Sequence, residues 1–488
     1  MFPLSFSSYY EPMKLNELKV TNPYLALASE CYDRVSPDPL HNPHLIHANS
    51  NMAKKLNIDE DELSTENFVN LINGSYKLEG ADTFAMCYAG HQFGYFVPRL
   101  GDGRAINIGT IDTFHLQLKG AGETKYSRSG DGRAVLRSSI REYLMSEAMN
   151  SLGIPTTLCL GLIGSEHQVQ RERVETGAVV CRVSTSWVRF GTFEYYASKG
   201  MFKELEALAD YVIDESFQHL KGRDDPYTML FNDVVVITAR LMAQWMSVGF
   251  NHGVMNTDNM SIAGLTIDYG PYAFLDDFRH ENICNHTDVN GRYSYANQPN
   301  VAKWNLQALM KALSPLTTVE KMQKSLTMYD KIYTRYLHYY MCKKLGFEAT
   351  VEGDPELIDD MFDMLEKLNV DYTLFMRTLS HYEGDRKALL ATGLYHEPMN
   401  DWLDRYDERI KYIDKTTRKK QMLGANPKYI LKNYMLQEAI DAAEKGDFSI
   451  VGNLFDIAQK PFDEHPEFER WAEATPDAFK NRKLSCSS

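Results

Sequence analysis

The sequence lacks the patterns that mark secreted, membrane and zinc-scaffold proteins. None of its seven cysteines are paired in Cys-x-x-Cys spacing, which argues against a disulfide framework and against a zinc site. The N-terminus has no basic start followed by an apolar run, and no apolar stretch is long enough to span a bilayer. We therefore expect a cytoplasmic protein without a membrane partner, and a monomer.

The chain also lacks an excess of positive charge. Its formal net charge is −14, which argues against nucleic acid as the main partner. A basic island nevertheless lies between positions 119 and 141. It suits a small phosphorylated ligand, although a solvated helix face explains any single member equally well. Its members are Lys119, Lys125, Arg128, Arg133, Arg137 and Arg141.

Two cysteines differ from the rest, which we expect to be small buried side chains. Cys486 lies third from the end, on a polar tail where burial in the core is not expected. Cys284 lies in a polar loop, between positions 282 and 288. A redox link between Cys284 and Cys486 is therefore one hypothesis for the tail.

Hydrophobic periodicity predicts an α+β protein with four segments. Residues 1–80 form an N-terminal extension without evident chemistry. Residues 81–201 contain glycine-punctuated strands, expected at 105–108, 114–119 and 179–183, and one helix at 138–152. Residues 202–330 form a helical catalytic region that includes an apolar helix at 232–248. Residues 331–488 continue as amphipathic helices.

A short motif, Gly-Asp-Gly-Arg-Ala, occurs at 101–105 and again at 130–134. Glycine pairs bring backbone N–H groups close to phosphate oxygens, and the arginine adds a planar cation. The pattern is neither a Walker A loop nor a Rossmann fingerprint. Two Asp-Gly turns are the alternative explanation. The candidate nucleotide-binding residues are Gly101, Gly103, Arg104, Asp131 and Gly132.

The strongest signal lies between His252 and Gly270. A protein-kinase catalytic loop has His-Arg-Asp, four residues and Asn, followed by Asp-Phe-Gly. His252 and Asn259 match this spacing, and Asp268-Tyr269-Gly270 matches the second motif. Val254 stands where the kinase base would be, so ordinary phosphorylation is not expected.

The same loop offers metal ligands and a different base. Asn259 and Asp268 supply the hard oxygen ligands that magnesium prefers beside phosphates. Asp258 is the only carboxylate within the loop that can accept a proton from a hydroxyl. We expect His252 to hold the loop rather than to act in catalysis, and we expect one strand between the loop and Asp268.

Four further charged residues fit the same interpretation. Lys119 closes an amphipathic strand and is expected to grip phosphates, with Glu142 on the next helix as its partner. An edge-strand charge and a Ser139–Glu142 capping box are the alternatives. Arg182 and Arg189 flank a short polar segment and can clamp a phosphate chain, although pattern alone favours surface arginines.

These motifs together closely resemble the selenoprotein O family. The resemblance rests on residues 88–94, 100–104, 119–122, 126–128, 130–142, 252–261 and 284–286, and it covers nearly the whole chain. It departs from the family at Ala105, where many members have glycine, and this leaves the nucleotide preference open. Cys486 occupies the place where some animal members carry selenocysteine.

Membership would imply a bilobal, protein-kinase-like fold that binds ATP in a flipped orientation. It would imply transfer of AMP, or of UMP from UTP, to hydroxyl side chains of protein substrates, with Mg²⁺ or Mn²⁺. Asp258 would then be the proton acceptor, and Asn259 and Asp268 the metal ligands. A conventional protein kinase and a catalytically inactive ATP-binding scaffold are the alternatives.

Overall fold

The computed structural model describes residues 11–485. The chain divides into two compact units that interleave along the sequence. The first unit extends to Cys87 and also includes Leu100–Ser139 and Thr157–Trp187. The second unit comprises Tyr88–Arg99, Ile140–Thr156 and everything from Val188 onward. The architecture is mixed α+β, with an N-terminal antiparallel sheet followed by a largely helical region, as the sequence predicts at that level.

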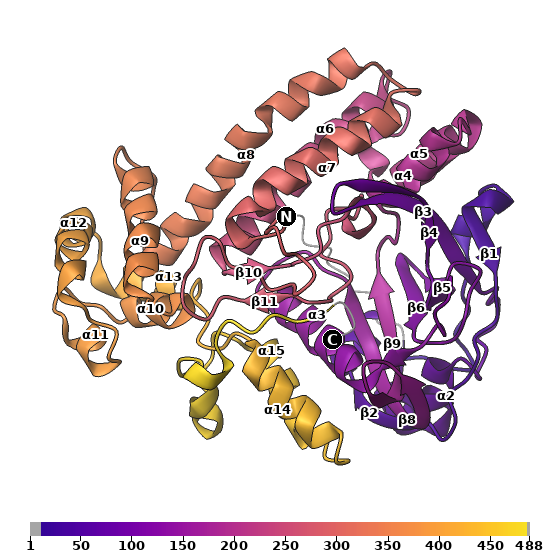
Figure 1. The fold of residues 1–488 in the computed structure, drawn as a ribbon, viewed down its shortest axis with the longest axis horizontal. Helices are drawn as coiled ribbons and strands as arrows, with labels where there is room; N and C mark the ends of the chain where they lie inside the picture. Colours follow the sequence, from indigo (N-terminus) through magenta and orange to yellow (C-terminus); the bar gives the residue numbers. More distant parts are fainter. Residues whose placement is uncertain (1–10, 486–488) are drawn as a thin grey trace. The chain divides into compact units, whose positions relative to one another are not determined.

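A nine-stranded sheet forms the first unit and extends into the β3–β4 hairpin (Figure 1). Its order is β1-β3-β5-β6-β9-β8-β2, with β4 on β3 and β7 on β9. The six neighbouring pairs along this path are antiparallel. The strands are β1 Tyr32–Arg34, β2 His44–Ala48, β3 Phe84–Gln92, β4 Tyr95–Gly101, β5 Ala105–Ile111, β6 Phe114–Lys119, β7 Ala134–Val135, β8 Leu158–Gln170 and β9 Val174–Ser184.

The predicted strands are confirmed, and the structure lengthens two of them. The strand expected at 105–108 continues to Ile111, and the one expected at 179–183 runs from Val174 to Ser184. Leu116 and Leu118 of β6 point into an apolar core with Ile106 and Val179, as their alternation predicts. The N-terminal segment contributes to the same core, through Leu15, Leu18, Val20, Met52, Phe68 and Leu71 among others.

The second unit is built mostly from helices, and α6, α7 and α8 run side by side (Figure 1). Its helices begin with α3 Leu136–Ser151, whose first four residues belong to the first unit. The others are α4 Phe190–Ser198, α5 Phe202–Ser216, α6 Pro226–Ser247, α7 Gln298–Leu313, α8 Val319–Leu345, α9 Asp354–Leu368, α10 Tyr372–Leu379, α11 Lys387–Ala391, α12 Asn400–Ile410, α13 Lys415–Leu423, α14 Asn433–Ala443 and α15 Ser449–Gln459. The first unit also contains α1 Ser50–Lys55 and α2 Glu66–Asn73.

The helix that leads to the catalytic loop is α6, and it is longer than the apolar periodicity predicts. It begins at Pro226, a residue suited to the first helical turn because its missing N–H would have no partner there. It ends before Gly249, whose φ of 71° turns the chain into β10 Phe250–Asn251. β10 pairs with β11 Ala273–Phe274 and so closes the loop between them. No helix in residues 11–485 is both long and apolar enough to cross a bilayer.

Candidate active site

His252 fixes the start of the loop that follows β10. Its side chain is 1% exposed and stacks on Trp245 with ring centroids 5.3 Å apart. Nε2 donates to the Ile267 carbonyl over 2.9 Å, and Nδ1 accepts from the Val254 N–H over 3.3 Å. Burial lowers the pKa of His252, so the ring is neutral at pH 7. The histidine therefore has the structural role that the sequence predicts, tying the loop to the residue before Asp268.

Asp258 lies in a short 3₁₀ turn, Thr257–Asn259, and its carboxyl group is buried. Oδ2 accepts a hydrogen bond from Nε2 of Gln92 over 3.2 Å. Within the part of the chain that the structure describes, Oδ1 has no hydrogen-bond partner. Burial is the main cause that raises the pKa of Asp258 to about 6. A carboxylate with such a pKa and a vacant oxygen is suited to accepting a proton near neutral pH.

Two glycines make room for this carboxyl group. A Cβ added to Gly90 on β3 would lie 2.5 Å from Oδ1 of Asp258. A Cβ on Gly191 in α4 would lie 2.1 Å from the Ala89 carbonyl oxygen and 3.3 Å from the Asp258 Cα. Both distances to oxygen are shorter than a carbon–oxygen contact allows, so a larger residue would displace the aspartate or the strand. Gln92 and Gly90 are thus supporting residues that no spacing rule connects with Asp258 in the sequence.

Asn259 and Asp268, the predicted metal ligands, belong to the same unit. The amide N–H of Asn259 donates to the Val254 carbonyl over 3.0 Å, and its carbonyl oxygen is the atom that the metal-ligand prediction requires. Asp268 has a positive φ of 57° and is partly exposed. The prediction of a strand before Asp268 is wrong, because residues 261–267 make only isolated bridges, from Ser261 to Arg189 and from Thr266 to Thr156.

Arg189 joins the two acidic positions of the loop. Its guanidinium is buried, and Nη1 donates to the Asp258 carbonyl over 2.6 Å and to the Asp268 carboxylate. Its Cζ lies 4.9 Å from the centre of the Tyr88 ring. The surface location that pattern alone favours is therefore wrong for Arg189. A buried arginine between two acidic residues orders the site, and its contact with a nucleotide stays a prediction.

In the first unit, the first glycine-rich loop is held by Asp102, which belongs to the first Gly-Asp-Gly-Arg-Ala motif but was not among the candidate nucleotide-binding residues. Oδ2 of this buried residue accepts from the Met86 N–H and from Gln117 Nε2, both over 3.2 Å. Gln117 in turn accepts a hydrogen bond from Arg182, which is 1% exposed and lies 4.6 Å from the Trp187 ring centre. The second face of β6 is therefore a buried polar network, and Arg182 is also not a surface residue.

The remaining predicted nucleotide-binding residues lie in loops beside this network. Gly101 and Gly103 pack against Tyr126, and the Arg104 carbonyl accepts from the Gly120 N–H over 2.7 Å. Gly132 has a left-handed φ of 66°. The Asp131 carboxylate makes a two-point ion pair with Arg171, at 2.7 and 2.8 Å. Hydrogen bonding from Arg171 lowers the pKa of Asp131, so this aspartate is ionised.

Three of the six residues of the basic island, Lys125, Arg133 and Arg137, make ion pairs within the first unit. Arg137 makes a two-point ion pair with Glu175, at 2.7 and 3.0 Å, and Arg133 pairs with Asp38. Lys119 ends β6 opposite Val180, whereas Glu142 is buried on the part of α3 that belongs to the other unit. Their ion pair stays a prediction.

The six described cysteines are all buried, as predicted for most of them. Cys284 is included, and burial raises the pKa of its thiol to about 12, so its loop is less open than its polar sequence indicates. Leu484 lies alongside it: the Leu484 N–H donates to the Cys284 carbonyl over 2.9 Å, and its carbonyl accepts from the His286 N–H over 2.8 Å. Cys486 lies outside the described residues, and the redox link stays a prediction.

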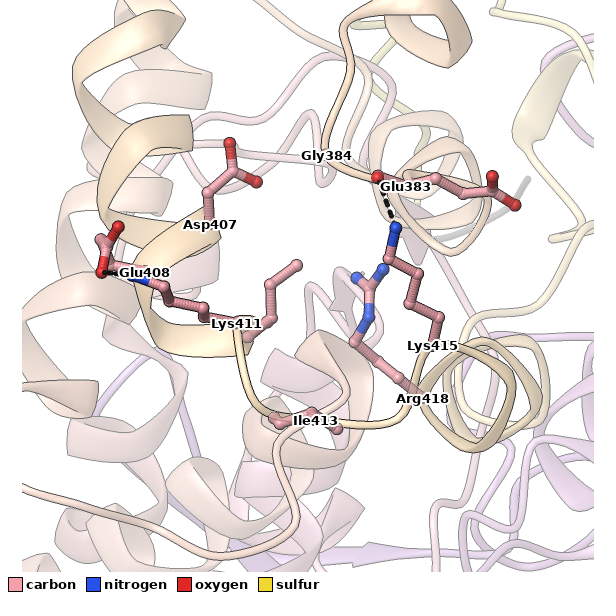
Figure 2. Close-up of a pocket in the computed structure, with 9 residues that line it drawn as sticks. Glu383, Gly384, Asp407, Glu408, Lys411, Ile413, Lys415 and Arg418 are labelled. Carbon is pink, nitrogen blue, oxygen red and sulfur yellow. Dashed lines mark hydrogen bonds and ion pairs between the residues drawn. The ribbon is translucent and has the colours of Figure 1, made fainter.

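A pocket of about 360 Å³ lies elsewhere in the second unit, between α12 and the start of α13 (Figure 2). Its charged groups mostly bind one another or the backbone. Lys415 donates to the Glu383 carbonyl over 3.4 Å, Lys411 pairs with Glu408 at 3.3 Å, and the buried Arg418 donates to Tyr406. None of the predicted site residues lines this pocket, which is therefore not the candidate active site. The candidate active site is the loop around Asp258.

Comparison with known proteins also indicates an enzyme that uses a nucleotide. A family model described as "Protein adenylyltransferase SelO" matches residues 14–459. A protein nucleotidyltransferase YdiU of Myxococcus xanthus is 44% identical over 97% of this chain and 99% of its own length. The YdiU proteins of Aliivibrio fischeri and Herminiimonas arsenicoxydans are 45% and 42% identical, each over 97% of this chain and over 99% and 98% of their own lengths.

The matched region includes every described residue of the candidate site. The family model and these relatives show a transferase that uses a nucleotide and acts on proteins. The chain belongs to the SelO family of protein adenylyltransferases and is a protein nucleotidyltransferase.

Proposed function

We propose that this enzyme transfers AMP from ATP, or UMP from UTP, to serine, threonine or tyrosine hydroxyls of target proteins. The observation that carries the proposal is Asp258: a buried carboxylate with a raised pKa and one vacant oxygen, beside Asn259. The fold is proposed to be protein-kinase-like and bilobal, with residues 81–201 as the N-lobe and 202–330 as the catalytic C-lobe. The segments 1–80 and 331–488 extend it.

In the proposed reaction, the acceptor hydroxyl attacks the α-phosphorus of the nucleotide. Asp258 takes the hydroxyl proton through Oδ1, the bond between the α-phosphorus and the bridging oxygen breaks, and pyrophosphate leaves. Gln92 holds the other carboxylate oxygen, and Arg189 holds the backbone at the same residue. These contacts fix the base before the substrates arrive, which lowers the cost of positioning it during the reaction.

The residues present fit a metal ion that arrives with the nucleotide. The described residues contain no group of three or more His, Cys, Asp or Glu side chains placed to hold a metal ion. Asn259 and Asp268 supply two oxygens, and Mg²⁺ commonly completes such a pair with water and phosphate oxygens. We propose these two residues as the ligands of Mg²⁺ or Mn²⁺. When bound, the ion would neutralise charge on the phosphates.

The glycine-rich loops and the basic residues are proposed to hold the phosphates. Backbone N–H groups at Gly101, Gly103 and Gly132 suit close approach by an anion. Arg104, Lys119, Arg182 and Arg189 would add positive charge, with Glu142 holding Lys119. Asp131 would act by ordering its loop through Arg171. A disulfide between Cys284 and Cys486 is proposed as a redox control of the tail.

Labelled nucleotides test the function directly. Protein that retains label from the α-position of ATP supports nucleotidyl transfer. Retention of γ-label instead would establish a conventional kinase, and neither label with intact nucleotide binding would establish a scaffold. The Asp268→Ala variant should lose transfer while leaving the fold intact; an active variant would remove the metal-ligand assignment.

A further inference from the structure

The turn between β3 and β4 is attached to the catalytic loop by its backbone. The His91 N–H donates to the Thr257 hydroxyl over 2.6 Å. The Phe93 N–H donates to the Asn256 side chain over 3.3 Å and to the Tyr293 hydroxyl over 2.9 Å. Since Thr257 and Asn256 directly precede Asp258, the position of this turn is coupled to the position of the base.

A buried glutamate fixes the histidine of this turn. Nδ1 of His91 lies 2.5 Å from Oε1 of Glu194, whose side chain is 4% exposed. The His91 ring is 25% exposed and lies between two other rings, with centroids 5.0 Å from Phe96 and 5.1 Å from Trp304. Such edge and tilted contacts between rings are favourable beyond the area they bury. His91 is thus held as part of a preformed aromatic surface.

The surface continues into a side chain that is open to solvent. Phe96 is 39% exposed, although it is large and apolar. We call His91, Phe96 and Trp304 the aromatic platform. Exposed aromatic groups that cluster beside a functional residue are typical of sites that bind another protein.

A cation without a carboxylate partner lies against the platform. The Arg292 guanidinium carbon is 4.7 Å from the Trp304 ring centre and would be 3.4 Å from a Cβ at Gly94. Among residues 11–485, no carboxylate lies within ion-pair distance of this guanidinium, and its Nε has no hydrogen-bond partner. A partly buried arginine in this state is suited to a carboxylate brought by a ligand.

We propose that the aromatic platform and Arg292 are the docking surface for the acceptor protein. This inference rests on the proposed function and names the partner's chemistry: a segment with an apolar or aromatic side chain and an acidic side chain close to the target hydroxyl. The apolar group packs on Phe96, and the carboxylate binds Arg292. Gly90 contacts Asp258 and directly precedes His91 of the platform. Because one strand residue spans only about 3.3 Å, the platform begins next to the residue that contacts the base.

Two matched synthetic peptides test the proposal. Each contains one tyrosine; one has Glu and Phe beside it, and the other has Gln and Ala. With α-labelled ATP, the wild type should modify the Glu-Phe peptide with a kcat/KM about tenfold higher, because a charge pair and an aromatic contact together contribute on this scale. Arg292→Gln should abolish the part of the preference due to Glu, and Phe96→Ala the part due to Phe. Each effect should be mainly in KM.

Tyr412→Ala is the matched control, because Tyr412 is 92% exposed and lies outside the platform. It should keep the full preference, as all variants should keep the wild-type Kd for ATP. The inference is overturned if Arg292→Gln discriminates between the peptides as strongly as the wild type, or if Tyr412→Ala loses the preference as much as the platform variants. Absence of α-label on any protein or peptide contradicts the proposed function itself, whereas label without peptide preference contradicts only the docking surface.

Discussion

The burial of Asp258 predicts that its ionised form lowers the stability of the folded enzyme at neutral pH. The pKa of this carboxyl rises from 3.8 to about 6 in the folded protein, so ionising it there costs about 3 kcal/mol more than in the unfolded chain. Between these two values the folded state binds more protons than the unfolded state. Stability from this residue is therefore lost as the pH rises through that window.

The Asp258→Asn substitution removes this dependence. The amide oxygen can still accept from Gln92, and the amide nitrogen replaces an oxygen that has no partner among the described residues. Burying that nitrogen offsets part of the gain, so we expect a net stabilisation of about 1–2 kcal/mol at pH 8. The stability of the variant minus that of the wild type should increase by about 2 kcal/mol from pH 4.5 to pH 8.

Thermal unfolding at a series of pH values measures this difference as a few degrees of Tm. Asp401→Asn, at an exposed position of α12, is the control and should follow the wild type at every pH. The reasoning is refuted if the Tm difference between Asp258→Asn and the wild type does not vary with pH, or if it grows toward acid. The same variant should lose transfer by 10² to 10⁴ in kcat, the usual contribution of a general base.

Four further predictions follow from the site. The rate of transfer should rise with pH around 6, since only the ionised Asp258 accepts a proton, and a pH–rate profile of kcat would show this limb. Gln92→Leu removes the donor that stabilises the carboxylate and should move the limb to higher pH, whereas an unmoved limb would rule out that contact. Gly90→Ala should abolish transfer with little change in nucleotide Kd, because its Cβ would meet Asp258; full activity would show that the strand can shift. EDTA should stop transfer, and Mg²⁺ or Mn²⁺ should restore it less well in Asn259→Ala than in the wild type.

Local sequence patterns predicted the elements that local forces determine. The alternation of Leu116 and Leu118 identified β6, and apolar periodicity with Gly249 identified the end of α6. The spacing from His252 to Asn259 identified the loop. These features depend on neighbouring residues along the chain, which is why one sequence was enough.

Long-range partners could not be predicted in the same way. Gln92 meets Asp258 across 166 positions, and Asp131 meets Arg171 across 40. No periodicity connects such residues, and only the folded chain brings them together. The burial of Arg182 and Arg189 was missed for the same reason, because their partners Gln117 and Asp268 lie on other elements. The strand expected before Asp268 failed because the segment forms only single bridges.

The transfer of α-label from ATP to protein by the wild type and by Asp258→Asn tests the central claim most directly. The account predicts rapid labelling by the wild type and labelling at least a hundredfold slower by the variant, with equal Kd for ATP. Labelling from the γ-position, or equal α-labelling by both proteins, would contradict the assignment of Asp258 as the base of a nucleotidyl transfer.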